Sequence, residues 1–425
     1  MIESFPVLME KETSEFKRNI GYYYSYFVNQ ALISPDIVQI TLTYRCNLRC
    51  KMCNIRNIKA ENEISFTRIK SLIDEAAEWG VPELLLLGGE PFLHSELMNF
   101  IHYAGSKGLK TTIVTNGTLI DDKMARIIAD APLTQLVISL DGARAKTHDS
   151  LRGIAGSYDK AINAIRLVDK YKRNMGKTRF DSPLLIIPIT LMNNNLDEMW
   201  KYVVLANRLP VSALGFQPVV IDNANLKYSD TNHAVWIPPH RLKLLDKMVD
   251  KVIRYKKIRK EKQPVIGNTP VHLEAIKKYF RNVLTQQDIK CYIGYTRVVI
   301  SPDGNTSLCG ESIGNVNTHS MQDMWRSDLA RQARNRIKKC EKPCLQFCTL
   351  RPESELKEAL NIFLQKADFR NCNSEVKKLI RENIVNIFSQ MRCILKQCQK
   401  IGTDQAGLES EIDSAISMID NLSVS

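Results

Sequence analysis

Six apolar runs alternate with amphipathic segments between residues 36 and 258, and this alternation restricts the folds open to the chain. The apolar runs are nearly continuous in Val, Ile and Leu, as in strands buried on both faces. Right-handed crossovers convert this order into a parallel sheet covered by helices, either open or curled towards a barrel. We expect strands at 37–43, 83–87, 110–115, 134–140, 184–191 and 212–217, and helices at 66–79, 95–104, 121–130, 157–171, 196–207 and 239–257.

Polar residues and glycines follow five of these six strands. Ligands of parallel α/β sheets bind at the carboxyl ends of the strands, so we expect these residues to share one site. They are Cys46, Cys50 and Cys53 after the first strand, Gly88-Gly89-Glu90-Pro91 after the second, Thr115-Asn116-Gly117 after the third, Ser139-Leu140-Asp141-Gly142 after the fourth and Gln217-Pro218 after the sixth.

The eleven cysteines are clustered, which points to metal binding, because disulfides are rare in a reducing compartment. Cys46, Cys50 and Cys53 form a CxxxCxxC loop, and three thiolates leave one iron of a 4Fe–4S cubane open to an external chelator. A structural zinc site needs four ligands, and the nearest further candidate is His94, beyond the next strand. A ferredoxin-type electron carrier is the other alternative.

The composition predicts a cytoplasmic protein. No run of about 18 apolar residues predicts a membrane span, and the acidic N-terminus lacks an apolar signal core. The net charge of +13 is carried partly by runs such as 256–262, which are typical of solvated helix faces. An acidic or phosphate-bearing ligand would also fit the charge. Nucleic acid ranks low as a partner, since aromatic residues are not interleaved with the basic ones.

The cysteine loop at residues 43–53, placed after the first strand of a six-fold strand–helix alternation, resembles the radical S-adenosylmethionine (radical SAM) superfamily. The resemblance implies an α/β fold with a partial (β/α)6 TIM-like barrel, and a 4Fe–4S cluster bound by Cys46, Cys50 and Cys53. In this family S-adenosylmethionine chelates the open iron and is cleaved reductively to a 5′-deoxyadenosyl radical, which takes a hydrogen atom from the substrate. The resemblance also implies an external one-electron reductant of the flavodoxin or ferredoxin type.

Other turn residues match family positions that contact S-adenosylmethionine. Gly88-Gly89-Glu90-Pro91 matches the family's GGEP motif, in which glycines allow close backbone approach and a carboxylate holds the methionyl ammonium. A plain strand-to-helix turn is the alternative. The resemblance implies that S-adenosylmethionine is bound by Met52, Gly88, Gly89, Glu90, Asn116, Ser139, Asp141, Arg152 and Gln217, with strand capping as an equal alternative for Gln217. His148 is expected to be structural, and no catalytic acid or base emerges from residues 180–290.

Five further cysteines lie between residues 291 and 348. Pro302-Asp303-Gly304 predicts a hairpin with strands at 297–300 and 306–308, which lets Cys291 and Cys309 approach each other. Their order resembles the auxiliary-cluster module called SPASM, or its shorter form, twitch. This chain has fewer cysteines than a full SPASM module, so the resemblance implies one auxiliary 4Fe–4S cluster, bound by Cys291, Cys309 and two of Cys340, Cys344 and Cys348. Zinc is the rival metal here. Cys372 has a spacing that suits a further ligand, but we expect a buried free thiol on a helix, and Cys393 and Cys398 are expected to be helix-face residues.

We expect five segments: an N-terminal helical segment (1–35), the radical SAM barrel (36–258), a connector (259–290), the auxiliary-cluster domain (291–350) and a helical extension (351–425). The resemblance implies a radical SAM oxidoreductase or maturase that performs a net oxidation or bond formation. Its substrate would be a ribosomal peptide or a small-molecule biosynthetic intermediate. The alternatives are a non-catalytic iron–sulfur electron-transfer or binding protein, and a zinc-stabilised interaction module built on 291–350.

Overall fold

A computed structural model describes residues 17–26, 29–58, 63–220, 234–341 and 343–345, together with short stretches between 377 and 417. The chain forms two compact units, one of Pro35–Leu350 and the other of Met1–Ser34 with Arg351–Ser425. In the second unit residues 17–26 form a helix in which Tyr22 and Tyr24 are buried. Within the described part of the chain, no helix combines the length and the apolar composition that a membrane crossing requires.

The larger unit is built on one ten-stranded sheet with the order β10-β9-β8-β1-β2-β3-β4-β5-β6-β7. Strands β1 to β7 are parallel to their neighbours, which confirms the predicted α/β fold. Valine, isoleucine and leucine side chains on β1 to β6 are mostly buried, as expected for strands covered on both faces. The strands are β1 Ile37–Thr41, β2 Glu83–Leu87, β3 Lys110–Thr115, β4 Gln135–Ile138, β5 Leu184–Leu191, β6 Ala213–Pro218 and β7 Val265–Ile266.

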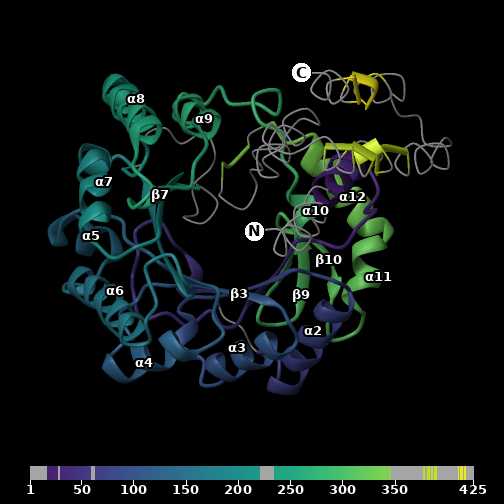
Figure 1. Cartoon of the computed structure of the whole chain (residues 1–425), viewed down its shortest axis with the longest axis horizontal. Coiled ribbons are helices and arrows are strands. Elements are labelled where there is room, and N and C mark those ends of the chain that lie inside the picture. The colour runs from purple at the N-terminus through teal and green to yellow at the C-terminus, as the bar shows by residue number, and fades with distance from the viewer. Residues whose placement is uncertain are drawn as a thin grey trace. The chain divides into compact units, whose positions relative to one another are not determined.

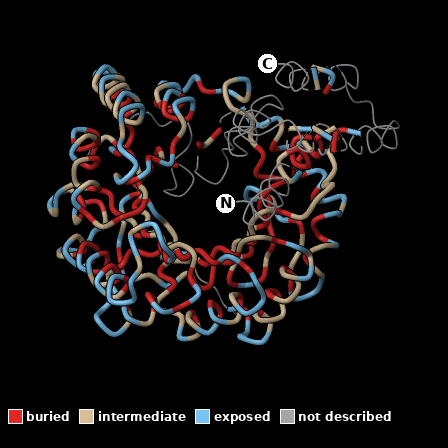
Figure 2. Tube along the Cα trace, viewed as in Figure 1, coloured by how far each residue is buried: buried red, intermediate tan, exposed pale blue. Residues whose placement is uncertain are grey.

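Helices cover the outer side of this curved sheet (Figure 1). Each buries one stripe of apolar residues, so that burial is concentrated between helices and sheet (Figure 2). Helix α2 begins where the Ser65 side chain accepts a hydrogen bond from Arg68 N. The outer helices are α2 Phe66–Glu78, α3 Leu97–Ser106, α4 Asp122–Asp130, α5 Ala145–Arg152, α6 Ser157–Asn174, α7 Met199–Arg208, α8 Leu242–Ile258 and α9 Pro270–Phe280.

The predicted hairpin is formed by β8 Arg297–Ile300 and β9 Asn305–Leu308, and β10 Glu311–Asn315 pairs with β9. Strand β8 also pairs in parallel with β1, with Ile37 opposite Arg297. The hairpin therefore extends the barrel sheet, a connection that the sequence did not predict, and it covers the edge of β1 that would otherwise expose unpaired backbone groups. Short helices α10 Ile293–Thr296, α11 Met321–Arg326 and α12 Asp328–Lys338 flank these strands.

Candidate functional site

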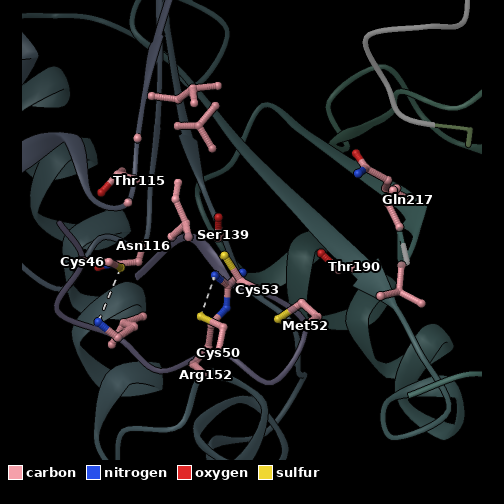
Figure 3. Close-up of a pocket in the computed structure, with 18 residues that line it drawn as sticks. Cys46, Cys50, Met52, Cys53, Thr115, Asn116, Ser139, Arg152, Thr190 and Gln217 are labelled. Carbon is pink, nitrogen blue, oxygen red and sulfur yellow. Dashed lines mark hydrogen bonds between the residues drawn. The ribbon is translucent and has the colours of Figure 1, made fainter. Parts of the chain in front are cut away.

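A cavity of about 290 Å³ lies at the carboxyl ends of the parallel strands, where the sequence predicted a site. Figure 3 shows the cysteine loop on one side of this cavity and Gln217 on a strand across from it. Most of the predicted residues line the cavity: Cys46, Cys50, Met52, Cys53, Gly88, Gly89, Asn116, Ser139, Arg152 and Gln217. The sequence reasoning missed Thr190, near the end of β5, and the apolar lining formed by Leu87, Val114, Val219 and Val220.

The turn after β2 packs directly against the cysteine loop. Gly89 N donates a hydrogen bond to Thr43 O (2.8 Å), and Glu90 N donates one to Arg45 O (2.9 Å). A Cβ atom added to Gly89 would lie 2.2 Å from Arg45 O, which no real side chain tolerates. The two glycines therefore allow the backbone of the second turn to support the backbone that carries Cys46.

A second set of hydrogen bonds ties the cysteine loop to the turn after β3. The Asn116 side-chain amide donates to Asn47 Oδ1 (2.8 Å), and the Asn47 amide donates to the hydroxyl of Thr118 (2.8 Å). Asn116 therefore lines the cavity and positions the loop at the same time.

The three thiols of the loop differ in exposure, with Cys46 and Cys50 partly buried and Cys53 exposed. Burial raises the pKa of the Cys46 and Cys50 thiols, and each is also influenced by the charge on Cys53. Among the described residues, no three His, Cys, Asp or Glu side chains gather tightly enough to hold a single metal ion.

Arg152, the last residue of α5, connects the cysteine loop to a buried carboxylate. Its Nη2 lies 2.7 Å from Oδ2 of Asp141, and its Nη1 lies 3.8 Å from Sγ of Cys50. Burial opposes the charged guanidinium, but the charges on Asp141 and the nearby thiols outweigh it and raise the pKa of Arg152. Its Nε is buried and has no hydrogen-bond partner in the described part of the chain, while the residue as a whole lines the cavity.

Asp141 is fully buried and does not line the cavity. Its Oδ1 accepts a hydrogen bond from Thr190 N (2.8 Å), and its own N donates to Nδ1 of His148 (3.2 Å). Burial and the charge of Arg152 lower the pKa of His148 to about 4, so this histidine stays neutral. Asp141 and His148 thus connect the loops after β4 and β5 by hydrogen bonds. The Asp141 carboxylate does not line the cavity itself, but it pairs with Arg152, which does.

Glu90 is also fully buried and lies outside the cavity lining. Its carboxylate accepts hydrogen bonds from Phe92 N (3.1 Å), the Thr115 hydroxyl (2.7 Å) and Asn116 N (2.8 Å). Burial raises the pKa of Glu90, although these donors oppose the rise. Glu90 thus links the turn after β2 to the turn after β3 by hydrogen bonds, which the sequence did not predict. Its contact with S-adenosylmethionine stays a prediction.

A second group of cysteines lies at the open end of the β8–β9 hairpin. The thiols of Cys309, Cys340 and Cys344 are close enough to act electrostatically on Cys291, whose pKa is raised first by burial and then by their charges. Cys291 N donates a hydrogen bond to Gln286 Oε1 (3.0 Å), and the Gln286 amide donates to Ile337 O (2.9 Å) at the end of α12. Cys309, Cys340 and Cys344 therefore lie in the same region of the structure as Cys291, whereas Cys348, Cys372, Cys393 and Cys398 lie outside the described residues.

Arg334 of α12 fixes the segment that follows Cys291. This buried guanidinium donates to Gly294 O (2.8 Å) and to Trp325 O (2.8 Å), and it stacks over the Trp325 ring at 4.4 Å. Burial lowers its pKa to about 10, so it remains charged at neutral pH. Arg334 thus ties α10 to α11 and α12, the helices that lead to Cys340.

Two family models match the chain, one described as "Radical SAM superfamily" over residues 40–201 and one as an iron–sulfur cluster-binding SPASM domain over residues 291–349. The Fe-coproporphyrin III synthase of Methanosarcina barkeri is 40% identical over 30% of this chain and 33% of its own length. The mycofactocin maturase MftC of Mycobacterium tuberculosis is 26% identical over 72% of this chain and 74% of its own. The chain spans about a third of the length of that synthase and about half of the length of two S-adenosylmethionine-dependent heme synthases to which it is also similar.

Solved structures share the fold of this chain. SuiB of Streptococcus suis, bound to its precursor peptide SuiA, aligns with a TM-score of 0.56 at 17% identity, covering 76% of this chain and 69% of SuiB. The enzyme anSMEcpe with bound S-adenosylmethionine aligns with a TM-score of 0.55 at 16% identity, covering 79% and 97% of the two chains. At these identities the likeness concerns the fold alone.

Proposed function

We propose that this chain, which belongs to the radical SAM superfamily and carries a SPASM domain, is an enzyme that removes a hydrogen atom from a peptide substrate. A radical SAM domain implies a 4Fe–4S cluster and S-adenosylmethionine, and a SPASM domain implies auxiliary iron–sulfur clusters. The observation that carries the proposal is that the CxxxCxxC thiols and the Gly88-Gly89 backbone line one cavity.

The side chains of this cavity fit those groups. Cys46, Cys50 and Cys53 would hold the cluster, and Met52, between the last two, is buried against the same cavity. When bound, the cluster supplies an electron and S-adenosylmethionine supplies the radical that abstracts hydrogen. The guanidinium of Arg152, which lines the cavity, would orient the carboxylate of S-adenosylmethionine, and Asn116 and Ser139 offer further hydrogen bonds.

The apolar residues of the cavity would keep water away from the reacting atoms. Leu87, Val114, Val219 and Val220 line it beside the polar groups of Thr190 and Gln217. Exclusion of water protects a reactive species from side reactions. Thr190 and Gln217 lie on neighbouring strands opposite the cysteines and would contact the substrate.

A peptide substrate is favoured by the extent of the comparisons. The match to mycofactocin maturase MftC covers 72% of this chain, whereas the match to Fe-coproporphyrin III synthase covers 30%. The auxiliary cysteines around Cys291 favour a net oxidation, because a second cluster can accept the electron that the substrate radical releases.

The test is anaerobic reconstitution with iron and sulfide, followed by dithionite and S-adenosylmethionine. We expect 5′-deoxyadenosine from the wild type and none from Cys50→Ala, while Cys393→Ala, outside both cysteine motifs, serves as the matched control. Absence of 5′-deoxyadenosine from a wild type that has bound iron would favour a non-catalytic electron carrier instead. Short peptides encoded beside the gene are then tested as substrates, and a mass decrease that accompanies 5′-deoxyadenosine would support the peptide assignment.

A further inference from the structure

The start of helix α9 is bound to strand β6, which forms one wall of the cavity. Phe216 N donates a hydrogen bond to Oδ1 of the buried Asn268 (2.7 Å), and Asn268 Nδ2 donates one to Phe216 O (2.7 Å). Phe216 directly precedes Gln217, which lies across the cavity from the cysteine loop (Figure 3). The side chain of Asn268 is therefore held at a fixed place behind this wall.

The other end of α9 contacts the same wall. The Tyr279 hydroxyl donates a hydrogen bond to Val219 O (2.8 Å), and Val219 lines the cavity. His272 lies two turns before Tyr279, so the two side chains share one face of the helix. Helix α9 is thus bound to the backbone on both sides of Gln217.

His272 extends these contacts to the second cysteine group. In its buried ring, Nδ1 lies 3.4 Å from Asn268 Nδ2 and Nε2 lies 3.4 Å from Leu345 O. The bonds of Asn268 to Phe216 fix Nδ2 as a donor, so Nδ1 of the ring accepts and Nε2 carries the hydrogen that a carbonyl requires. Both distances are long for hydrogen bonds, but they lie in the interior, where a low dielectric strengthens such contacts. One tautomer of a neutral ring therefore satisfies both contacts.

The backbone that His272 contacts has an unfavourable conformation. Leu345 has a φ of 52°, in the left-handed region that leucine rarely adopts, and its side chain is buried. Such a conformation persists only where its surroundings hold it in place. Leu345 directly follows Cys344, whose charge acts on Cys291. The contacts that hold Leu345 therefore also determine where the backbone of Cys344 lies.

We propose that His272 is a positioning residue for the second cysteine group, which holds Leu345, and thereby Cys344, at a fixed place relative to the β6 wall of the cavity. The inference rests on the proposed function, in which this group binds an iron–sulfur cluster. Hydrogen bonds around a metal site orient its ligands, and their loss typically weakens metal binding by about 10–100-fold. His272 would thus affect the second cluster without binding it.

Two substitutions of His272 separate its two contacts. In His272→Gln the side-chain amide can take the place of Nε2 and donate to Leu345 O, whereas the shorter side chain of His272→Asn ends near the position of Nδ1. We expect iodoacetamide to alkylate Cys344 of the full chain, before reconstitution, about three- to tenfold faster in His272→Asn than in the wild type. His272→Gln should react at about the wild-type rate. The exposed Cys53 is the internal reference and should react equally in all three proteins.

A spectroscopic measurement tests the effect on the reconstituted protein. A Cys50→Ala background removes one ligand of the first group, so the EPR spectrum of the reduced protein reports on the second group. There we expect altered g values or less iron per chain in His272→Asn, and the spectrum of the background protein in His272→Gln. A merely structural role would lower the urea midpoints of the two variants and leave the g values unchanged.

The outcomes decide the inference in either direction. Wild-type alkylation and spectra in His272→Asn, or equal changes in both variants, would overturn it. If neither variant folds, Leu345→Gly decides, because glycine keeps the carbonyl and adopts the left-handed conformation without strain. Slow alkylation of Cys344 in Leu345→Gly would support the hydrogen bond from His272 as the contact that holds the segment, and rapid alkylation would contradict it.

Failure of the proposed function would be visible separately. A wild type that binds iron but forms no 5′-deoxyadenosine would contradict the proposed function. The alkylation rates of Cys344 do not depend on that reaction, so they would still decide the role of His272.

Discussion

Arg152 and Asp141 form an ion pair of 2.7 Å that is almost wholly shielded from water, with 13% and 0% of their side-chain surfaces exposed. The same guanidinium faces Sγ of Cys50 at 3.8 Å. The position of the cysteine loop therefore depends on a carboxylate that never reaches the cavity itself.

Replacement of Arg152 by glutamine should destabilise the folded protein strongly. It leaves the buried charge of Asp141 without a partner, which costs about 3–5 kcal/mol. The double variant Arg152→Gln/Asp141→Asn removes that charge and should recover part of the lost stability. Urea denaturation of the wild type, Arg152→Gln, Asp141→Asn and the double variant would measure the four unfolding free energies. Additive effects of the two substitutions would show that the pair is not coupled.

Replacement of Gly89 by alanine should impair assembly of the first cluster. The added Cβ would lie 2.2 Å from Arg45 O, so the cysteine loop must move. Gly267→Ala is the control, because its Cβ would meet only Leu214 O at an ordinary 3.7 Å. After identical reconstitution, we expect less iron per chain in Gly89→Ala and a wild-type content in Gly267→Ala. Equal iron contents would refute the packing argument.

The stability of the protein should fall with acidification, through His148. Its pKa in the folded state is lowered to about 4 from the ordinary value of 6.5, so the unfolded chain takes up the proton first as pH falls. The contribution is fully present above pH 6.5 and is lost as pH falls towards 4. Between pH 7 and pH 5 this amounts to about 2 kcal/mol. His148→Gln, which cannot take up this proton, should reduce the pH dependence of the unfolding free energy by that amount.

Iron and zinc analysis should show whether the second cysteine group binds an iron–sulfur cluster or a zinc ion. One cubane at each group gives about eight irons per chain, and Cys309→Ala should lower this to about four. Iron near four with zinc near one in the wild type would show instead that zinc occupies the second group. Iron near twelve would mean a further auxiliary cluster.

The parallel strands and the cysteine loop were predictable because their signals are local. Runs of Val, Ile and Leu mark the six barrel strands, and the spacing of Cys46, Cys50 and Cys53 defines one loop. Strand β7 has only two residues, Val265 and Ile266, and so carries no periodic signal. The pairing of β8 with β1 joins segments far apart in the chain, and strand propensity does not identify a partner.

The site was predictable only in part, since burial depends on the whole fold. The protein contacts of Glu90 and Asp141, both fully buried, had no local signal in the sequence, and their contact with S-adenosylmethionine stays a prediction. Nothing near Thr190 in the sequence distinguishes it from other strand residues. Its position in the cavity follows from the end of β5 lying beside β6.

The parallel pairing of β8 with β1 sets the distance between the two cysteine groups. Cys46 follows the carboxyl end of β1, whereas Cys291 and Cys309 flank the opposite end of the neighbouring hairpin. A five-residue strand spans about 17 Å. The route for an electron between the groups thus has a length fixed by hydrogen-bonded strands, and insertions in the connecting loops would leave it unchanged.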